Sequence, residues 1–243
     1  MPASDEFELS ITKALTDQLA AQLAALTPAP LTPANLALLR PEQGIYQLYE
    51  RGSLVYIGST SRTLPERLRQ HLIKLSGREN VSLADIKFIC LYVREDMTVL
   101  APEVSLIASA KVAGAAPWNF NGFGNKDPGR NRDGTRMDPA HFDRLYPRRL
   151  AWLCSTVVAG AYAADDLLRA LKAELPFLLR YDTKPNARVD YATATLTVPR
   201  PGMKAEDLFA LLAAALPTYQ ITALPGYVIV YKESHQYPNA QVF

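Results

Sequence analysis

The chain has 243 residues, 49% of them apolar and 21% charged, so it is long enough to bury a substantial core and has an ordinary globular composition. No apolar run approaches the roughly 20 residues of a membrane-spanning helix. The acidic N-terminus MPASDEFELS lacks the basic and apolar regions of a secretory signal, so we expect a cytoplasmic protein with no membrane partner. A net charge of +2 is too small to indicate nucleic-acid binding by itself.

The N-terminal region predicts a helix, a linker and then a hairpin. Residues 8–26 carry apolar side chains at helical spacing, and the proline-bearing linker TPAPLTPAN follows. We assign residues 1–40 to this helix and linker. The stretch GIYQLYERGSLVYIG (44–58) then predicts a β-hairpin with a tight turn.

The loop length of this hairpin decides whether Tyr46 and Tyr56 share one face, because strand side chains alternate between faces. A two-residue turn at Arg51-Gly52 would place Tyr56 opposite Gln47 and separate the tyrosines. A three-residue loop that ends with a left-handed Gly52 would pair Tyr46 directly with Tyr56. We expect the second arrangement, with both hydroxyls on one face.

A helix is predicted over residues 64–76, where Thr63 and Glu66 form a capping box. Leucines at helical spacing form its buried stripe, and a neighbouring stripe places Arg67 and His71 one turn apart. A single histidine beside an apolar stripe is commonly structural. An Arg-x-x-x-His pair beside two convergent tyrosines favours a chemical role.

The next segments predict a strand, a helix and a long loop. Residues 85–93 read as a buried strand, and a helix is expected from Glu103 to Val112. Glu103 either complements the helix dipole or binds a hard divalent cation, Mg²⁺ or Mn²⁺. Residues 114–140 are rich in Gly, Asn, Asp and Arg, and loops of that length inside a compact domain are usually functional or mobile.

Basic residues concentrate in residues 62–78 and 126–149, where they either contact phosphates or form a solvated face. Arginine can read guanine bidentately, and a phosphate contact is at least as common a role for each side chain. The candidate DNA contacts are Arg62, Arg69, Lys74, Lys126, Arg130, Arg132 and Arg136.

The last part of the chain, residues 151–243, predicts an α/β accessory region of unknown role. Its charges cancel, and it contains no catalytic constellation and no repeat. The whole chain is therefore expected to be α/β in the α+β sense. The elements expected in this region are helices over 165–175 and 204–216 and strands over 191–198 and 227–231.

The order of these elements resembles a known nuclease family. Gly44-Ile45-Tyr46, then Tyr56-Ile57-Gly58, a helix with Arg67, a helix with Glu103 and an asparagine after Pro-Trp resemble the GIY-YIG endonuclease superfamily over about residues 40–149. The stretch NFNGFGNKDPGRNRDG, with Arg67, His71 and the N-terminal helix, is similar to the branch of type II restriction endonucleases that cut the palindrome CCGCGG.

This resemblance implies a fold and an activity. The fold is a small central antiparallel sheet flanked by helices over residues 41–150, with residues 114–140 as a DNA-contacting loop. The activity is hydrolysis of double-stranded DNA with Mg²⁺ or Mn²⁺, by a homodimer that forms at least on DNA. A nuclease of repair, mobile-element or toxin type is the alternative, and an inactive DNA-binding scaffold is a further alternative.

The resemblance also implies roles for individual residues. Tyr46 is the general base, helped by Arg67 and with His71 as a proton relay. Glu103 is the metal ligand, and Tyr56 positions the phosphate or water. The implied catalytic residues are Tyr46, Tyr56, Arg67, His71, Glu103 and Asn119, with Asn121 as the alternative asparagine.

Overall fold

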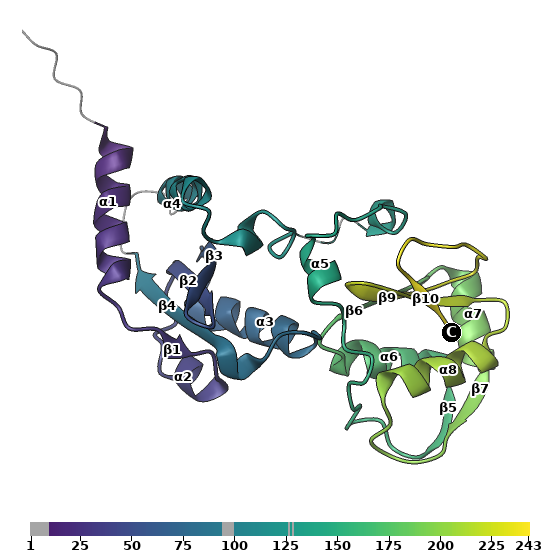
Figure 1. Ribbon diagram of the computed structural model, residues 1–243. Coiled ribbons are helices and arrows are strands. Elements are labelled where there is room, and N and C mark those ends of the chain that lie inside the picture. Colours follow the sequence, from purple (N-terminus) through teal and green to yellow (C-terminus); the bar gives the residue numbers. More distant parts are fainter. Residues whose placement is uncertain (1–9, 94–99, 126, 128) are drawn as a thin grey trace, which may run out of the picture. The chain divides into compact units, whose positions relative to one another are not determined.

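The computed structural model describes residues 10–93, 100–125, 127 and 129–243 (Figure 1). The chain is mixed α/β, with helices and mainly antiparallel sheets, which confirms the predicted α+β class. It divides into two compact units: the first comprises Met1–Leu72 and Ser82–Gly124, and the second comprises Ile73–Val81 and Asn125–Phe243. Within the described residues, no helix has both the length and the apolar content needed to cross a bilayer.

The first unit is built on a four-stranded antiparallel sheet with strand order β1-β4-β2-β3. Side chains of alternating parity point to its two faces. Ile45, Ile57 and Ile89 pack with Leu23 and Leu106 on one face, so α1 and α4 cover that face. The elements are α1 (Ile11–Ala24), β1 (Ala29–Pro30), α2 (Pro33–Ala37), β2 (Gly44–Glu50), β3 (Ser53–Thr60), α3 (Leu64–Ser76), η1 (Leu83–Asp85), β4 (Ile86–Tyr92), α4 (Leu100–Val112) and η2 (Pro117–Asn119).

The β2–β3 hairpin differs from the predicted one. Its turn has two residues, Arg51 (φ 49°) and Gly52 (φ 83°), so the expected three-residue loop is wrong. The expected direct pairing of Tyr46 with Tyr56 is wrong as well, because Tyr56 lies opposite Leu48. A β-bulge in β3 adds one residue after the turn and reverses the side-chain parity. The bulge therefore returns Tyr56 to the face of Leu48 and Tyr46, which are two residues apart in β2.

Helix α3 begins where the capping pattern predicts. The Thr63 hydroxyl accepts a hydrogen bond from the Glu66 backbone N–H at 3.4 Å. Leu64 and Leu68 are fully buried and Leu75 is 1% exposed, so the apolar stripe forms the packed side of the helix. This orientation places the neighbouring Arg67–His71 stripe at the edge of that packed side.

The second unit contains a four-stranded sheet of order β10-β8-β9-β6 and a separate antiparallel pair, β5–β7. Within the larger sheet only β6 and β9 are parallel. The elements are η3 (Gly129–Arg132), α5 (Phe142–Leu145), β5 (Gly160–Ala163), α6 (Ala164–Glu174), β6 (Leu178–Tyr181), α7 (Pro185–Thr193), β7 (Thr195–Val198), α8 (Ala205–Ala215), β8 (Gln220–Leu224), β9 (Tyr227–Tyr231) and β10 (Gln241–Val242).

The expected strand over residues 191–198 is only half correct. Residues up to Thr193 complete α7, and the strand begins at Thr195. Tyr191 is fully buried on α7, so packing of its aromatic ring prevails over the β-propensity of the alternating threonines that follow it.

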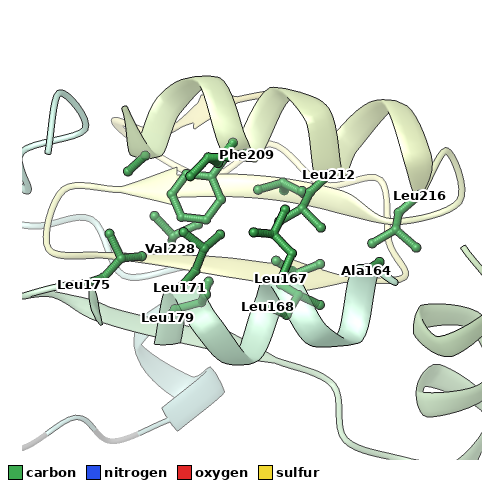
Figure 2. Close-up of a cluster of buried hydrophobic side chains, with 14 of the residues drawn as sticks. Ala164, Leu167, Leu168, Leu171, Leu175, Leu179, Phe209, Leu212, Leu216 and Val228 are labelled. Atoms are coloured by element: carbon green, nitrogen blue, oxygen red, sulfur yellow. The ribbon is translucent and has the colours of Figure 1, made fainter. Parts of the chain in front are cut away.

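A continuous apolar core holds the second unit together. Figure 2 shows leucines of α6 and α8 meeting around Phe209 and Val228. Leu167, Leu171 and Leu212 are completely buried, as expected for the apolar faces of amphipathic helices that cover a sheet.

The boundary between the units lies earlier than the expected position at residue 150. Residues 125–150 belong to the second unit and not to the unit that contains the hairpin. The reason is a set of polar contacts. Asp133 accepts hydrogen bonds from the Tyr227 hydroxyl at 2.7 Å and from Arg180, and Arg180 also pairs with Asp127 at 3.2 Å. These contacts attach the loop to β9 and β6.

Candidate active site

Tyr46 is the centre of a polar cluster inside the first unit. Its side chain is fully buried between the sheet and α3. The Tyr46 hydroxyl lies 2.7 Å from His71 Nε2 and accepts a hydrogen bond from Arg67 Nε at 3.1 Å. The structure therefore brings together the tyrosine, arginine and histidine that the sequence analysis singled out.

Gly58 provides the space that this arrangement needs. It lies directly opposite Tyr46 in the hairpin. A Cβ atom at Gly58 would be 2.5 Å from the Tyr46 hydroxyl and 2.8 Å from Cε1 of Tyr56. Both distances are below any tolerable contact, so only glycine lets the two rings lie over this position.

Tyr56 joins the same cluster through its ring. The ring centroids of Tyr56 and Tyr46 are 6.1 Å apart, and His71 lies 5.4 Å from each. The expectation that both tyrosines face one side is therefore met, although by a bulge instead of a longer loop. Phe123 stacks on the His71 ring at 5.0 Å, with an interplanar angle of 21°. A Cβ at Gly124 would come within 2.9 Å of the Tyr56 hydroxyl.

Burial controls the ionisation of the central phenol. It raises the pKa of Tyr46 well above the usual range, with a further rise from Tyr56 and Glu103. The charge and hydrogen bond of Arg67 lower the same pKa but do not compensate for burial. Burial raises the pKa of Tyr56 as well. Tyr46 is therefore a neutral phenol at neutral pH in this structure.

Glu103 lies in the first turn of α4 and is bound to the hairpin through Ser59. The Ser59 backbone N–H donates to Glu103 Oε1 at 3.1 Å, and the Ser59 hydroxyl donates to Oε2. Ser59 directly follows Gly58, so one short segment both accommodates Tyr46 and orients the carboxylate. The sequence analysis missed Ser59, because no local pattern indicates a contact with a residue 44 positions away.

The donor set fits a hard divalent cation bound mainly by substrate and water. In the described part of the chain, no three His, Cys, Asp or Glu side chains gather into a metal-binding group. Each Glu103 oxygen uses one acceptor position for Ser59 and retains another. Mg²⁺ commonly takes one or two carboxylates together with water and phosphate oxygens, and one partly exposed carboxylate meets that requirement.

Asn119 binds the backbone of the hairpin. Its Oδ1 accepts from the Ile57 N–H at 2.8 Å, and its Nδ2 donates to the Ile57 carbonyl at 2.7 Å. β3 is an edge strand, and this amide pairs with it as a neighbouring strand would. Asn119 thereby fixes the residue between Tyr56 and Gly58. Oδ1 of the alternative, Asn121, is buried with no hydrogen-bond partner among the described residues.

The candidate DNA contacts of the first unit are both exposed. Arg62 precedes α3 and Arg69 lies on its outer side. Both side chains are placed where a solvated face or a phosphate contact is possible, as the sequence analysis left open.

The candidates in the second unit differ from one another. Arg132 pairs with buried Asp143, and Arg130 lies 3.9 Å above the Tyr231 ring. Lys74 lies 5.3 Å above the Phe142 ring, and Arg136 is exposed. Arg130 and Arg132 therefore have structural contacts that their basic composition did not reveal. Lys126 lies outside the described residues.

A scan of the chain against protein-family models found no match, and a search of curated proteins also found none. The chemistry of the site follows from the groups gathered in the first unit. They are a neutral phenol bound to an imidazole, a guanidinium that donates to the phenol oxygen, and a carboxylate of α4 that is hydrogen-bonded to Ser59 of β3. Such a set can move one proton and hold an oxyanion.

Proposed function

We propose that this chain is a metal-dependent DNA endonuclease, and that it acts as a site-specific type II restriction enzyme at a GC-rich palindrome. The observation that carries this proposal is the buried Tyr46 hydroxyl held between His71 Nε2 and Arg67 Nε. The ordered GIY and YIG tripeptides on paired strands support the same reading.

Tyr46 and His71 are proposed to act together as the base. The attacking water gives its proton to the Tyr46 oxygen while the Tyr46 hydroxyl gives its own proton to His71 Nε2. This transfer requires a neutral imidazole with its proton on Nδ1, so that Nε2 accepts. A concerted relay avoids a free phenolate, which burial of Tyr46 strongly disfavours.

Arg67 is proposed to hold the scissile phosphate. Its Nε is bound to the Tyr46 oxygen and its Nη1 donates to Gln70 at 3.2 Å, so the guanidinium is fixed in orientation. The remaining N–H groups can donate to phosphate oxygens, for which a planar guanidinium is well matched. The nucleophile is thereby placed beside both its base and its electrophile.

Glu103 would hold Mg²⁺ or Mn²⁺, with Ser59 keeping the carboxylate in place. When bound, such a cation stabilises the charge that develops on the phosphate and on the leaving 3′ oxygen. Asn119 is proposed as a positioning residue, since it fixes Ile57 next to Tyr56.

Cleavage of both strands of a palindrome requires two sites related by a two-fold axis, so we expect a homodimer at least on double-stranded DNA. Incubation of the purified chain with supercoiled plasmid and Mg²⁺ should give discrete bands. A smear would support a nuclease of the repair, mobile-element or toxin type instead. Complete absence of cutting by a folded protein that binds DNA would support the scaffold.

A paired substitution tests the role of the carboxylate. Glu103→Ala should bind DNA as tightly as the unmodified chain and fail to cut it. Glu66→Ala is the matched control, because Glu66 also lies in the first turn of a helix but is exposed on α3. Normal cleavage by Glu103→Ala would remove the proposed metal site.

A further inference from the structure

The second unit contains a pair of arginines that the proposed chemistry does not use. Arg78 and Arg148 form a single antiparallel backbone bridge. Residues opposed in this way have Cβ atoms about 5 Å apart and point to the same side. The Arg148 backbone N–H donates to the Pro225 carbonyl at 2.8 Å, which fixes the strand segment that carries it.

One buried carboxylate, Asp143, neutralises part of this region. It is 3% exposed and binds Arg78 at 2.9 Å as well as Arg132. Arg78 also donates to the Tyr146 carbonyl at 3.1 Å. The negative charge of Asp143 is therefore already shared between two guanidinium groups.

Arg148, in contrast to Arg78 and Arg132, forms no ion pair with a carboxylate among the described residues. Its Nε is buried and has no hydrogen-bond partner within the described part of the chain. Burial and, to a smaller extent, the neighbouring Arg78 charge together lower its pKa to about 10. Arg148 as a whole is only partly buried, so an anion can still reach its guanidinium and offset the unfavourable placement of this charge beside Arg78.

Further positive charge surrounds the same carboxylate. Lys74 and Arg78 both lie over the Phe142 ring, at 5.3 Å and 5.4 Å. His141 accepts from the Asp143 backbone N–H and lies within electrostatic range of Lys74, Arg78 and Arg132. Several cationic side chains therefore lie near Asp143, and Arg148, paired with Arg78 in the backbone bridge, has no ion pair with any described residue.

We propose that Arg148, supported by Arg78 and Lys74, binds a phosphate of the DNA backbone and gives the second unit a direct part in DNA binding. A guanidinium suits phosphate oxygens because it offers parallel donors in a fixed plane. This inference rests on the proposed nuclease function, because it takes DNA as the ligand. It selects Arg148 from the basic stretch 126–149 as a phosphate contact, although Arg148 was not among the candidate DNA contacts.

The test compares Arg148→Met with the unmodified full-length chain in EDTA, where DNA is bound without cleavage. Each phosphate contact contributes about 0.9 to the slope of log affinity against log salt. The slope of the variant should be smaller by about that amount, so its affinity relative to the unmodified chain should fall by roughly eightfold for each tenfold decrease in salt concentration. In the absence of DNA, Arg148→Met should have the same Tm as the unmodified chain or a higher one, because an unpaired charge has been removed.

The matched control is Arg169→Met, since Arg169 is exposed and pairs with Asp165 and Asp166 on its own helix. It should leave both affinity and salt slope unchanged. Unchanged DNA affinity and slope in Arg148→Met would overturn the inference. A fall in its Tm would overturn it too, by assigning Arg148 a structural role.

Two further outcomes separate the sources of phosphate and the two proposals. If inorganic phosphate, at ionic strength matched with chloride, stabilised the unmodified chain but not Arg148→Met while duplex binding stayed equal, the ligand would be free phosphate and not DNA. If the unmodified chain bound no duplex at all, the proposed nuclease function would fail together with this inference. Binding that is unaffected by Arg148→Met would leave the proposed function intact.

Discussion

The two units bury polar groups in opposite ways. In the second unit, the carboxylates Asp133 and Asp143 are each bound by arginine, and a large apolar core surrounds α6 and α8. In the first unit, a phenol, an imidazole and a guanidinium meet on one sheet face, and Glu103 retains free acceptor positions. Ion pairs between side chains hold segments of a fold together, whereas a carboxylate with remaining acceptor positions can bind a cation or a substrate.

The largest effect is expected from Tyr46→Phe, which keeps the ring and deletes the hydroxyl. Cleavage should fall by about 10²–10⁴-fold, the usual contribution of a general base. DNA affinity should stay within about twofold, because the hydroxyl is buried and its own contacts are to His71 and Arg67. Single-turnover cleavage and binding in EDTA measure the two quantities.

Tyr49→Phe is the control for that substitution. The Tyr49 hydroxyl also donates a hydrogen bond within β2, to Gln47 at 2.6 Å, but on the opposite face of the sheet. The Tyr49→Phe variant should therefore cut DNA at the normal rate. If Tyr46→Phe also cut normally, the cluster in the first unit would have a structural role, like the ion pairs of Asp133 and Asp143 in the second unit.

The next effect concerns the space under the two rings. Gly58→Ala would put a Cβ 2.5 Å from the Tyr46 hydroxyl, and overpacking of this kind costs about 1–3 kcal/mol of unfolding free energy. Cleavage should fall as well, because the ring must move away from His71. Urea unfolding in a Trp152→Phe background measures the loss, since Trp118 then reports the first unit alone.

Gly134→Ala provides the comparison for this second change. Gly134 lies in the second unit, where an added Cβ would meet nothing within 4 Å, so calorimetry of the full chain should show an unchanged or slightly higher stability for Gly134→Ala. Equal stability of the two alanine variants would show that the Tyr46 ring can shift without cost.

Patterns within a single element were readable from the sequence. Periodicity gave α3, α6 and α8 to within one residue at each end, and β9 at its bounds. The shared face of Tyr46 and Tyr56 was also predicted, but through a loop length that is wrong. The bulge that achieves it has no local signature, because two-residue and three-residue turns both accommodate Gly52 at positive φ.

Contacts between distant elements were not readable. The bond from Ser59 to Glu103 and the stacking of Phe123 on His71 join segments more than 40 residues apart. The arginines of residues 126–149 illustrate the same limit. Their composition suggested one basic loop, yet Arg132 is committed to Asp143 and Arg136 is exposed, because charge pairing depends on proximity in space.

Arg132 and Arg136 should differ in their effect on stability, because Arg132 pairs with buried Asp143 and Arg136 is exposed. Arg132→Gln should lower the unfolding free energy by about 1–2 kcal/mol, since Asp143 keeps Arg78 but loses one of its two guanidinium partners. Arg136→Gln should leave stability unchanged, and it should reduce the salt slope of DNA binding if Arg136 contacts a phosphate. Calorimetry and binding at several salt concentrations measure both. Equal stability of the two variants would contradict the assignment of Arg132 as structural.

The smallest effect is expected in the pH dependence of cleavage above pH 8. Because burial holds the pKa of Tyr46 far above its usual value, the phenol stays protonated in this range, and raising the pH does not create its phenolate. The relay needs a neutral imidazole and no phenolate, so the rate should change by less than about twofold between pH 8 and pH 9. Single-turnover rates over that range measure this change.

A rate that rose tenfold per pH unit, and did so in the unmodified chain but not in Tyr46→Phe, would show that the phenolate is the base. The Tyr46 hydroxyl would then ionise during the reaction despite its burial, and the relay to His71 would be unnecessary.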